Sequence, residues 1–478
     1  MTLKTEVVRG LKWTAGAKLG SQLITWGITI FVMRLLSPSD YGLMAMASVF
    51  IVLLAMFVDM GLGSALIQVA EINIENMRKA FGLLLLTNGV LWAGLSLAAP
   101  LIADFYGEPR LTLVLRVLAL QYLLTPFYTM PDVLLQRRLE FRQRSLIELG
   151  SAVFGSLVTL LLALNQYGVW ALVIGNLAGT VWRTVAVNGV EPFRHLPLLA
   201  WRDMRSLLSF GGNITASRLL WFCYTQADTV IVGRMLGGQV LGLYSVAMHL
   251  ASLPLQRISA ILNQVAFPAF ARYQHDKELI GRQLKKAFSL MSLAAFPVLW
   301  GLACTAPELV PLLLGQGWEG AVLPLQILSL VMPFRTLLAF LPAITDAMGR
   351  PEAGMQNGLL GCLIMPPAYF IGCHWGIEGV AGAWGIVFPF VLLINMRRML
   401  KVIGLHMGDM LREIARPLLC AAGMAAMVRI ASPMLAGHVS AQLALVLEIV
   451  IGVVVYGVLT LMINFGAVRE VQRLVFNR

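Results

Sequence analysis

Apolar runs of about 20 residues follow one another along almost the whole chain, separated by short connections that hold most of the charge. An α-helix of about 20 apolar residues crosses the roughly 30 Å hydrocarbon core of a bilayer. The runs are continuous, whereas strands of a membrane barrel alternate apolar and polar residues. Only 13% of the 478 residues are charged, against about 25% in soluble domains. The sequence therefore predicts an all-α polytopic membrane protein.

Fourteen transmembrane helices are predicted from these runs. Each ends where charged residues, Gly or Pro interrupt the apolar pattern. They cover residues 14–36, 41–69, 80–104, 111–136, 146–165, 168–189, 207–233, 240–268, 288–314, 320–347, 353–374, 377–400, 416–436 and 440–465. The connections between them are too short for a soluble catalytic domain, so any activity is expected within the bilayer or at its surfaces.

The positions of Lys and Arg predict how the chain is oriented. Of the 36 basic residues, 27 fall in connections on one side or at the helix ends next to them, 4 fall likewise on the other side, and 5 lie further within helices. Cytoplasmic loops carry this excess in membrane proteins. We therefore expect both termini to be cytoplasmic. The net charge of +12 is explained by topology and by contact with anionic membrane lipids, and it does not indicate a nucleic-acid partner.

A repeated pattern suggests that the chain is built from two related parts. Residues 34–47 read RLLSPSDYGLMAMA and residues 234–247 read RMLGGQVLGLYSVA, with five of fourteen positions identical. The second copy includes a tight connection, Met235 to Gly238, which predicts a hairpin of two membrane helices. Parallel repeats of this kind are related by an axis along the membrane normal. The predicted parts are residues 1–195 (helices 1–6), 196–402 (helices 7–12) and 403–478 (two additional helices and a cytoplasmic tail).

The two hairpin sequences also carry a family resemblance. The pattern GRMLGGQVLGLYS, the Asp228 before it, the LPLQRISAILNQVAFPAFAR after it, and the N-terminal LLSPSDYGLMAMASVF and DMGLGSALIQ resemble the polysaccharide-transporter family, whose Wzx-type members are oligosaccharide-lipid flippases. The closer resemblance is to the lipopolysaccharide and colanic-acid exporter branch. This family shares a superfamily with multidrug-and-toxin exporters and lipid II flippases.

That resemblance implies a fold and an activity. The fold would be two six-helix lobes in a V, with two further helices. The activity would be the export of undecaprenyl-diphosphate-linked oligosaccharide across the bacterial inner membrane by alternating access. Polysaccharide polymerase and chain-length proteins are the expected protein partners.

Arginines within the predicted helices are the first candidates for a substrate site. A charge at the centre of a membrane helix costs at least about 2.5–3.5 kcal/mol, so its presence suggests a function. Arginine meets phosphate groups bidentately. The candidates for binding a diphosphate are Arg116, Arg218, Arg257 and Arg335. The alternative is that each pairs with a local acid or extends to the interface.

Acids and aromatic residues supply further candidates. Asp59 and Asp228 lie within helices and are candidates for binding a coupling H⁺ or Na⁺, although a structural hydrogen bond would also explain each. Trp221 and Tyr224 lie beside Arg218 on one helix and are candidates for stacking on sugar rings.

The sequence carries no enzyme motif that we can identify. It has no Walker lysine loop, no H-E-x-x-H and no D-x-D pattern, so no metal or cofactor is expected beyond a coupling ion. Two alternatives to the flippase remain. A cation-coupled drug exporter would favour acids over arginines in its cavity. A polysaccharide polymerase or ligase would need a large outer loop.

Overall fold

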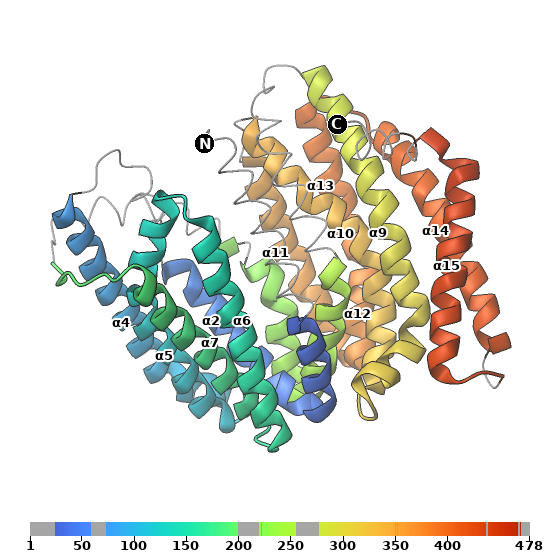
Figure 1. Ribbon diagram of the computed structural model, residues 1–478. Coiled ribbons are helices and arrows are strands. Elements are labelled where there is room, and N and C mark those ends of the chain that lie inside the picture. Colours follow the sequence, from blue (N-terminus) through green and yellow to red (C-terminus); the bar gives the residue numbers. More distant parts are fainter. Residues whose placement is uncertain are drawn as a thin grey trace. The chain divides into compact units, whose positions relative to one another are not determined.

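The computed structural model describes residues 24–58, 73–198, 219–220, 222–254, 277–348, 350, 352–435, 438–466 and 469, and these are nearly all α-helical, with no β-strand among them (Figure 1). Its helical elements in chain order are Ile24–Leu35, α2 (Pro38–Val58), α4 (Ile74–Tyr106), α5 (Arg110–Arg137), α6 (Phe141–Leu164), α7 (Val169–Val190), Phe222–Pro254, α9 (Lys277–Leu314), η1 (Glu319–Ala321), α10 (Val322–Ala347), α11 (Glu352–Gly372), η2 (Cys373–Trp375), α12 (Gly376–Ile386), α13 (Phe388–Ile403), α14 (Met407–Leu435) and α15 (Ala441–Ile463).

The helices are long and apolar enough to cross a membrane. In the described part of the chain, 11 helical stretches meet that criterion. Large apolar side chains stay exposed along them, with Leu97 78%, Met462 77% and Val453 69% exposed. Such surfaces are stable when they face lipid instead of water. The prediction of an all-α polytopic membrane protein is confirmed, and the number fourteen stays a prediction.

Several helices extend beyond the ranges predicted from apolar residues. α4 begins at Ile74, six residues before the predicted 80–104, because the Asn73 side chain accepts a hydrogen bond from the Glu75 backbone N–H. An ion pair of 3.0 Å between Lys79 and Glu75 then supports the first turn. Likewise, α9 begins at Lys277 and not at 288. Helical turns that contain charged residues are unfavourable in the hydrocarbon core, so the apolar pattern excludes them. They can still be helical outside the core.

One predicted helix is divided. The range 377–400 was expected to be continuous, but the structure has α12 ending at Ile386 and α13 beginning at Phe388. Pro389 sits in the first turn of α13. Proline has no N–H to donate to the carbonyl four residues earlier and is favoured at a helix start. Pro389 therefore explains the break between α12 and α13.

The segment Phe222–Pro254 is a helical hairpin. Its helical assignment is unbroken, yet the Tyr244 hydroxyl lies 2.6 Å from Asp228 Oδ2. Sixteen residues of straight helix would separate the two by about 24 Å. Gly237 has φ of +80°, which favours glycine and reverses the chain. The turn therefore falls within the predicted connection Met235 to Gly238.

The chain divides into two compact units. Unit 1 comprises Met1–Phe222 and Gly233–Gly242, and unit 2 comprises Cys223–Val232 and Leu243–Arg478. In unit 1, α6 packs along α7 and α4 along α5. In unit 2, α9, α10, α13 and α14 share a core that includes Phe288, Leu341, Met399 and Met410. The predicted lobes 1–195 and 196–402, and the third part 403–478, stay predictions.

Candidate functional site

A chain of buried hydrogen bonds crosses unit 2. Asp228, on the first arm of the hairpin, is 3% exposed. Tyr244, on the second arm, donates its hydroxyl to Asp228 Oδ2 at 2.6 Å. Trp384 of α12 donates its indole N–H to the Tyr244 oxygen at 2.9 Å. The other carboxylate oxygen of Asp228 accepts from the Thr229 backbone N–H at 2.7 Å. Hydrogen bonds to both carboxylate oxygens therefore fix the position of the Asp228 side chain.

Arg335 lies at the far end of the same group, midway along α10. Its guanidinium carbon sits 4.8 Å from the centre of the Trp384 ring. Its other contact is weak, 4.0 Å from the Met248 sulfur. Among the residues that the structure describes, Arg335 forms no ion pair within 4.0 Å. A guanidinium has five N–H donors, and an aromatic face and a thioether leave most of them without a partner among the described residues.

Two further tyrosines complete the aromatic surroundings. Tyr369 of α11 is fully buried, with its ring centre 5.7 Å from that of Trp384. Tyr224 is 6% exposed, and its ring packs so closely on Gly361 that a Cβ there would lie 2.4 Å away. We call Tyr224, Asp228, Tyr244, Arg335, Tyr369 and Trp384 the unit 2 cluster. It joins a hydrogen-bonded acid to an arginine through aromatic rings.

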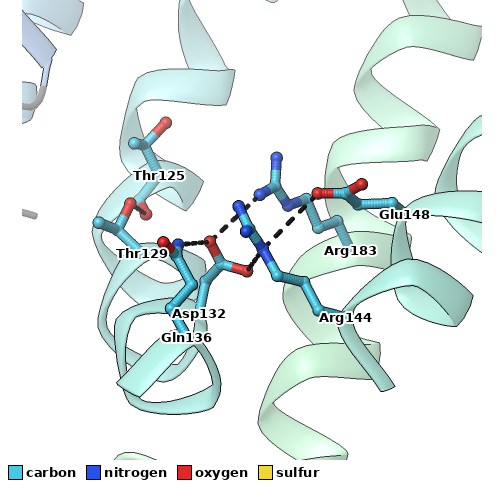
Figure 2. Close-up of polar contacts among 7 residues, drawn as sticks. All are labelled: Thr125, Thr129, Asp132, Gln136, Arg144, Glu148 and Arg183. Carbon is cyan, nitrogen blue, oxygen red and sulfur yellow. Dashed lines mark hydrogen bonds and ion pairs between the residues drawn. The ribbon is translucent and has the colours of Figure 1, made fainter. Parts of the chain in front are cut away.

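A second polar network links three helices of unit 1 (Figure 2). Asp132 of α5 accepts from Gln136 at 2.9 Å and from Arg144 of α6 at 3.0 Å. Arg183 of α7 lies 3.7 Å from the same carboxylate, and Arg144 is 3.7 Å from Glu148. Two acids and two arginines balance each other here. The network holds α5, α6 and α7 together and leaves no excess charge for a ligand.

The structure brings some predicted site residues together and separates another. Arg335, Asp228 and Tyr224 belong to the unit 2 cluster. Arg116 is on α5 in unit 1, exposed, and donates from Nε to the Ser96 carbonyl of α4 at 3.3 Å. Four candidates, Asp59, Arg218, Trp221 and Arg257, lie outside the described residues. The roles assigned to all eight stay predictions.

Sequence reasoning missed Tyr244 and Trp384. A signal for Tyr244 was present, because Asp228 and Tyr244 are equally far from residue 236 in the predicted turn. Residues at equal distances from a hairpin turn face each other. Trp384 lies 140 residues after Tyr244, and no local pattern joins the two. That contact depends on how α12 packs.

Comparisons with known proteins identify the family. A family model described as "Polysaccharide biosynthesis protein" matches residues 31–323. The chain belongs to this family. Teichuronic acid biosynthesis protein TuaB of Bacillus subtilis is 26% identical over 88% of each chain. Succinoglycan biosynthesis transport protein ExoT of Rhizobium meliloti is 26% identical over 97% of this chain and 94% of its own.

A solved structure shows the same fold. The lipid II flippase MurJ, in an inward closed conformation, superimposes with a TM-score of 0.75 over 94% of this chain and 97% of its own, at 14% identity. The family model thus confirms the resemblance to the polysaccharide-transporter family. The likeness to MurJ agrees with the predicted fold, a polytopic assembly of membrane helices.

Proposed function

We propose that this protein is a flippase that moves undecaprenyl-diphosphate-linked oligosaccharide between membrane leaflets by alternating access, for lipopolysaccharide or exopolysaccharide biosynthesis. Its family, its MurJ-like fold and a full-length relative named as a succinoglycan transport protein support this proposal. The cargo is an amphiphile with a dianionic headgroup, which needs cations to leave water.

The observation that carries the proposal is the environment of Arg335. A membrane arginine with an acid partner would be structural, but the described contacts of Arg335 are the Trp384 ring and the Met248 sulfur. A cation in a membrane helix with no ion pair among the described residues is costly. A phosphate group would accept two parallel hydrogen bonds from the guanidinium and compensate that cost. Tyr369 and Trp384 limit water around the arginine, which strengthens the interaction.

The unit 2 cluster also offers a place for energy coupling. We propose that Asp228 binds the coupling H⁺ or Na⁺, and that Tyr244 and Trp384 transmit its occupancy to Arg335. These four side chains form a continuous path through three contacts of 2.6, 2.9 and 4.8 Å. Without an ATP-binding motif in the sequence, an ion gradient is the natural source of energy.

The remaining parts of the proposal concern the cell. The uneven distribution of Lys and Arg supports placement in the bacterial inner membrane with both termini cytoplasmic. Transport would then run from the cytoplasmic to the periplasmic leaflet. A polysaccharide polymerase and a chain-length protein would receive the product.

The proposal is tested in a polysaccharide-producing strain that lacks this gene. Cells that carry Arg335→Gln should export about ten- to a hundredfold less surface polysaccharide than wild type, since a hydrogen bond to a charged group contributes about 1.5–3 kcal/mol. The lipid-linked oligosaccharide should accumulate in the cytoplasmic leaflet. Arg429→Gln, at an exposed position of α14, is the matched control and should export normally.

Two outcomes contradict different parts of the proposal. Normal export by Arg335→Gln at a normal membrane level would exclude Arg335 from the substrate site. Normal surface polysaccharide without the gene, and no accumulated lipid-linked intermediate, would exclude the flippase function itself.

A further inference from the structure

A cavity of about 460 Å³ opens between α6 and α7 in unit 1, with Tyr41 and Met44 of α2 along its side. Its volume lies within the range of about 300–1,000 Å³ that small-molecule sites occupy. We call it the α6–α7 pocket. It shares no residue with the unit 2 cluster or with the network in Figure 2.

Glycines bring the two helices close enough to form the floor of the pocket. A Cβ on Gly175 of α7 would lie 1.8 Å from the Thr159 hydroxyl of α6, and one on Gly155 would lie 2.9 Å from the Gly175 carbonyl. The Ser151 hydroxyl donates to the Gly179 carbonyl at 2.8 Å. Small residues at a membrane helix interface permit this approach. The pocket is therefore framed by two tightly packed backbones.

The polar groups of the pocket are hydroxyls and one amide. None of the described residues that line it is charged. Thr159 and Thr180 donate to the carbonyls of Gly155 and Asn176 in their own helices, so their remaining lone pairs can accept hydrogen bonds. Among the described residues, the Asn176 amide makes no hydrogen bond and Thr25 Oγ1 is buried without a partner. These groups match a ligand rich in neutral hydroxyls.

The position of Asn176 along α7 argues that the polar face of the pocket does not meet lipid. Asn176 is the eighth residue of α7, about 10 Å from the start of the helix, and its side chain is exposed. An amide facing hydrocarbon would lose its hydrogen bonds at considerable cost. Ile174, Val181 and Val185 lie on the opposite face of α7 and are 38%, 43% and 67% exposed. That apolar face suits lipid, and the Asn176 face suits a wet cavity.

We infer that the α6–α7 pocket is a subsite for an uncharged sugar residue of the lipid-linked oligosaccharide, which its hydroxyls and the Asn176 amide recognise. This inference rests on the proposed function. It assigns sugar recognition to unit 1, apart from Arg335. The described lining has no cation to neutralise a diphosphate, and a pocket with this many polar groups would hold a lipid chain poorly.

The test compares two lipid probes that differ only in the sugar. The full-length protein in nanodiscs is titrated with undecaprenyl diphosphate and with undecaprenyl-diphospho-N-acetylglucosamine, and bound lipid is counted by native mass spectrometry. Wild type should bind the sugar-bearing lipid at least about tenfold more tightly. Asn176→Leu and Thr180→Val should each reduce this ratio about three- to tenfold, the effect of one lost hydrogen bond. Binding of undecaprenyl diphosphate should not change.

Controls separate a local effect from a general one. Thr184→Val removes the same hydroxyl one turn further along α7, where it donates to the Thr180 carbonyl at 2.9 Å, and it should leave the ratio unchanged. Arg335→Gln should weaken both lipids and preserve the ratio. Ser156→Ala, which removes one oxygen from the pocket rim, provides a third variant if Asn176→Leu does not fold.

The outcomes distinguish this inference from the proposed function. If wild type binds both lipids equally, or the pocket variants keep the wild-type ratio, the sugar subsite is wrong and the flippase proposal stands. If wild type binds neither lipid, the flippase proposal fails first. If the Thr184→Val control lowers the ratio as much as Thr180→Val, the effect belongs to the helix and the subsite is again wrong.

Discussion

Gly42 and Gly242 occupy equivalent places in one helix crossing. A Cβ on Gly42 would lie 1.7 Å from the Gly238 carbonyl oxygen, and a Cβ on Gly242 would lie 1.7 Å from the Pro38 carbonyl oxygen. The carbonyl next to each glycine thus belongs to the residue four positions before the other glycine. Residues 38–42 and 238–242, one stretch from each copy of the repeated sequence, therefore contact each other reciprocally within unit 1.

Alanine at either glycine should destabilise the protein. The obstructing atoms are backbone carbonyls, which cannot rotate away, so we expect a loss of about 1–3 kcal/mol or more for Gly42→Ala and for Gly242→Ala. Gly89→Ala in α4 is the control, because among the described residues no atom outside the adjoining backbone of α4 lies within 4 Å of its Cβ position. Thermal unfolding in detergent, followed by size-exclusion chromatography, measures the difference. Equal melting temperatures for Gly42→Ala and Gly89→Ala would contradict the close crossing.

Removing the Tyr244 hydroxyl should cost more than removing that of Tyr369. Tyr244→Phe leaves Asp228 Oδ2 and the Trp384 N–H without their partner, so we expect a loss of about 1–3 kcal/mol. Tyr369 Oη is buried and makes no hydrogen bond with the described residues. Tyr369→Phe should therefore be neutral or stabilising. The comparison of the two melting temperatures tests this, and a Tyr244→Phe protein as stable as wild type would show that the hydrogen-bonded chain contributes nothing.

Neutralising Asp132 should loosen the three helices that it joins. Asp132→Asn leaves Arg144 and Arg183 with only Glu148 to balance them, and both arginines are 31% exposed, so solvent screens part of the effect. We expect a loss of about 1 kcal/mol that shrinks as salt is added. Glu75→Gln breaks one exposed pair with Lys79 and serves as the control. A Glu75→Gln change of the same size would show that the network adds nothing beyond a surface pair.

The orientation inferred from the basic residues is tested by fusions in the two connections that flank α5. Alkaline phosphatase placed after Gly107 should be active, because that connection is expected in the periplasm. The same enzyme after Leu139, in a connection rich in arginine, should be inactive. A fluorescent protein at the C-terminus should fold and fluoresce in the cytoplasm. The reverse pattern at Gly107 and Leu139, with equal amounts of fusion protein in the membrane, would invert the topology.

Helix ends show what apolar patterns convey and what they omit. The apolar run predicted a helix over 80–104, but α4 starts at Ile74, where a cap and an ion pair stabilise turns that contain charge. In the same way, Pro389 divides a range that hydropathy treats as continuous. Hydropathy identifies the part of a helix that lies in the hydrocarbon core, whereas hydrogen bonds determine where the helix begins and ends.

The sequence by itself determined that this chain spans a membrane as helices, because backbone groups in lipid must be satisfied within each segment. It also determined the hairpin, because Gly237 and Gly238 follow an apolar run and a second run returns. Only the tertiary structure decided that Asp228 reaches Arg335 through Tyr244 and Trp384, and that glycines on α6 and α7 form a polar pocket. Those contacts join residues far apart in the chain, and their partners are chosen by the packing of whole helices.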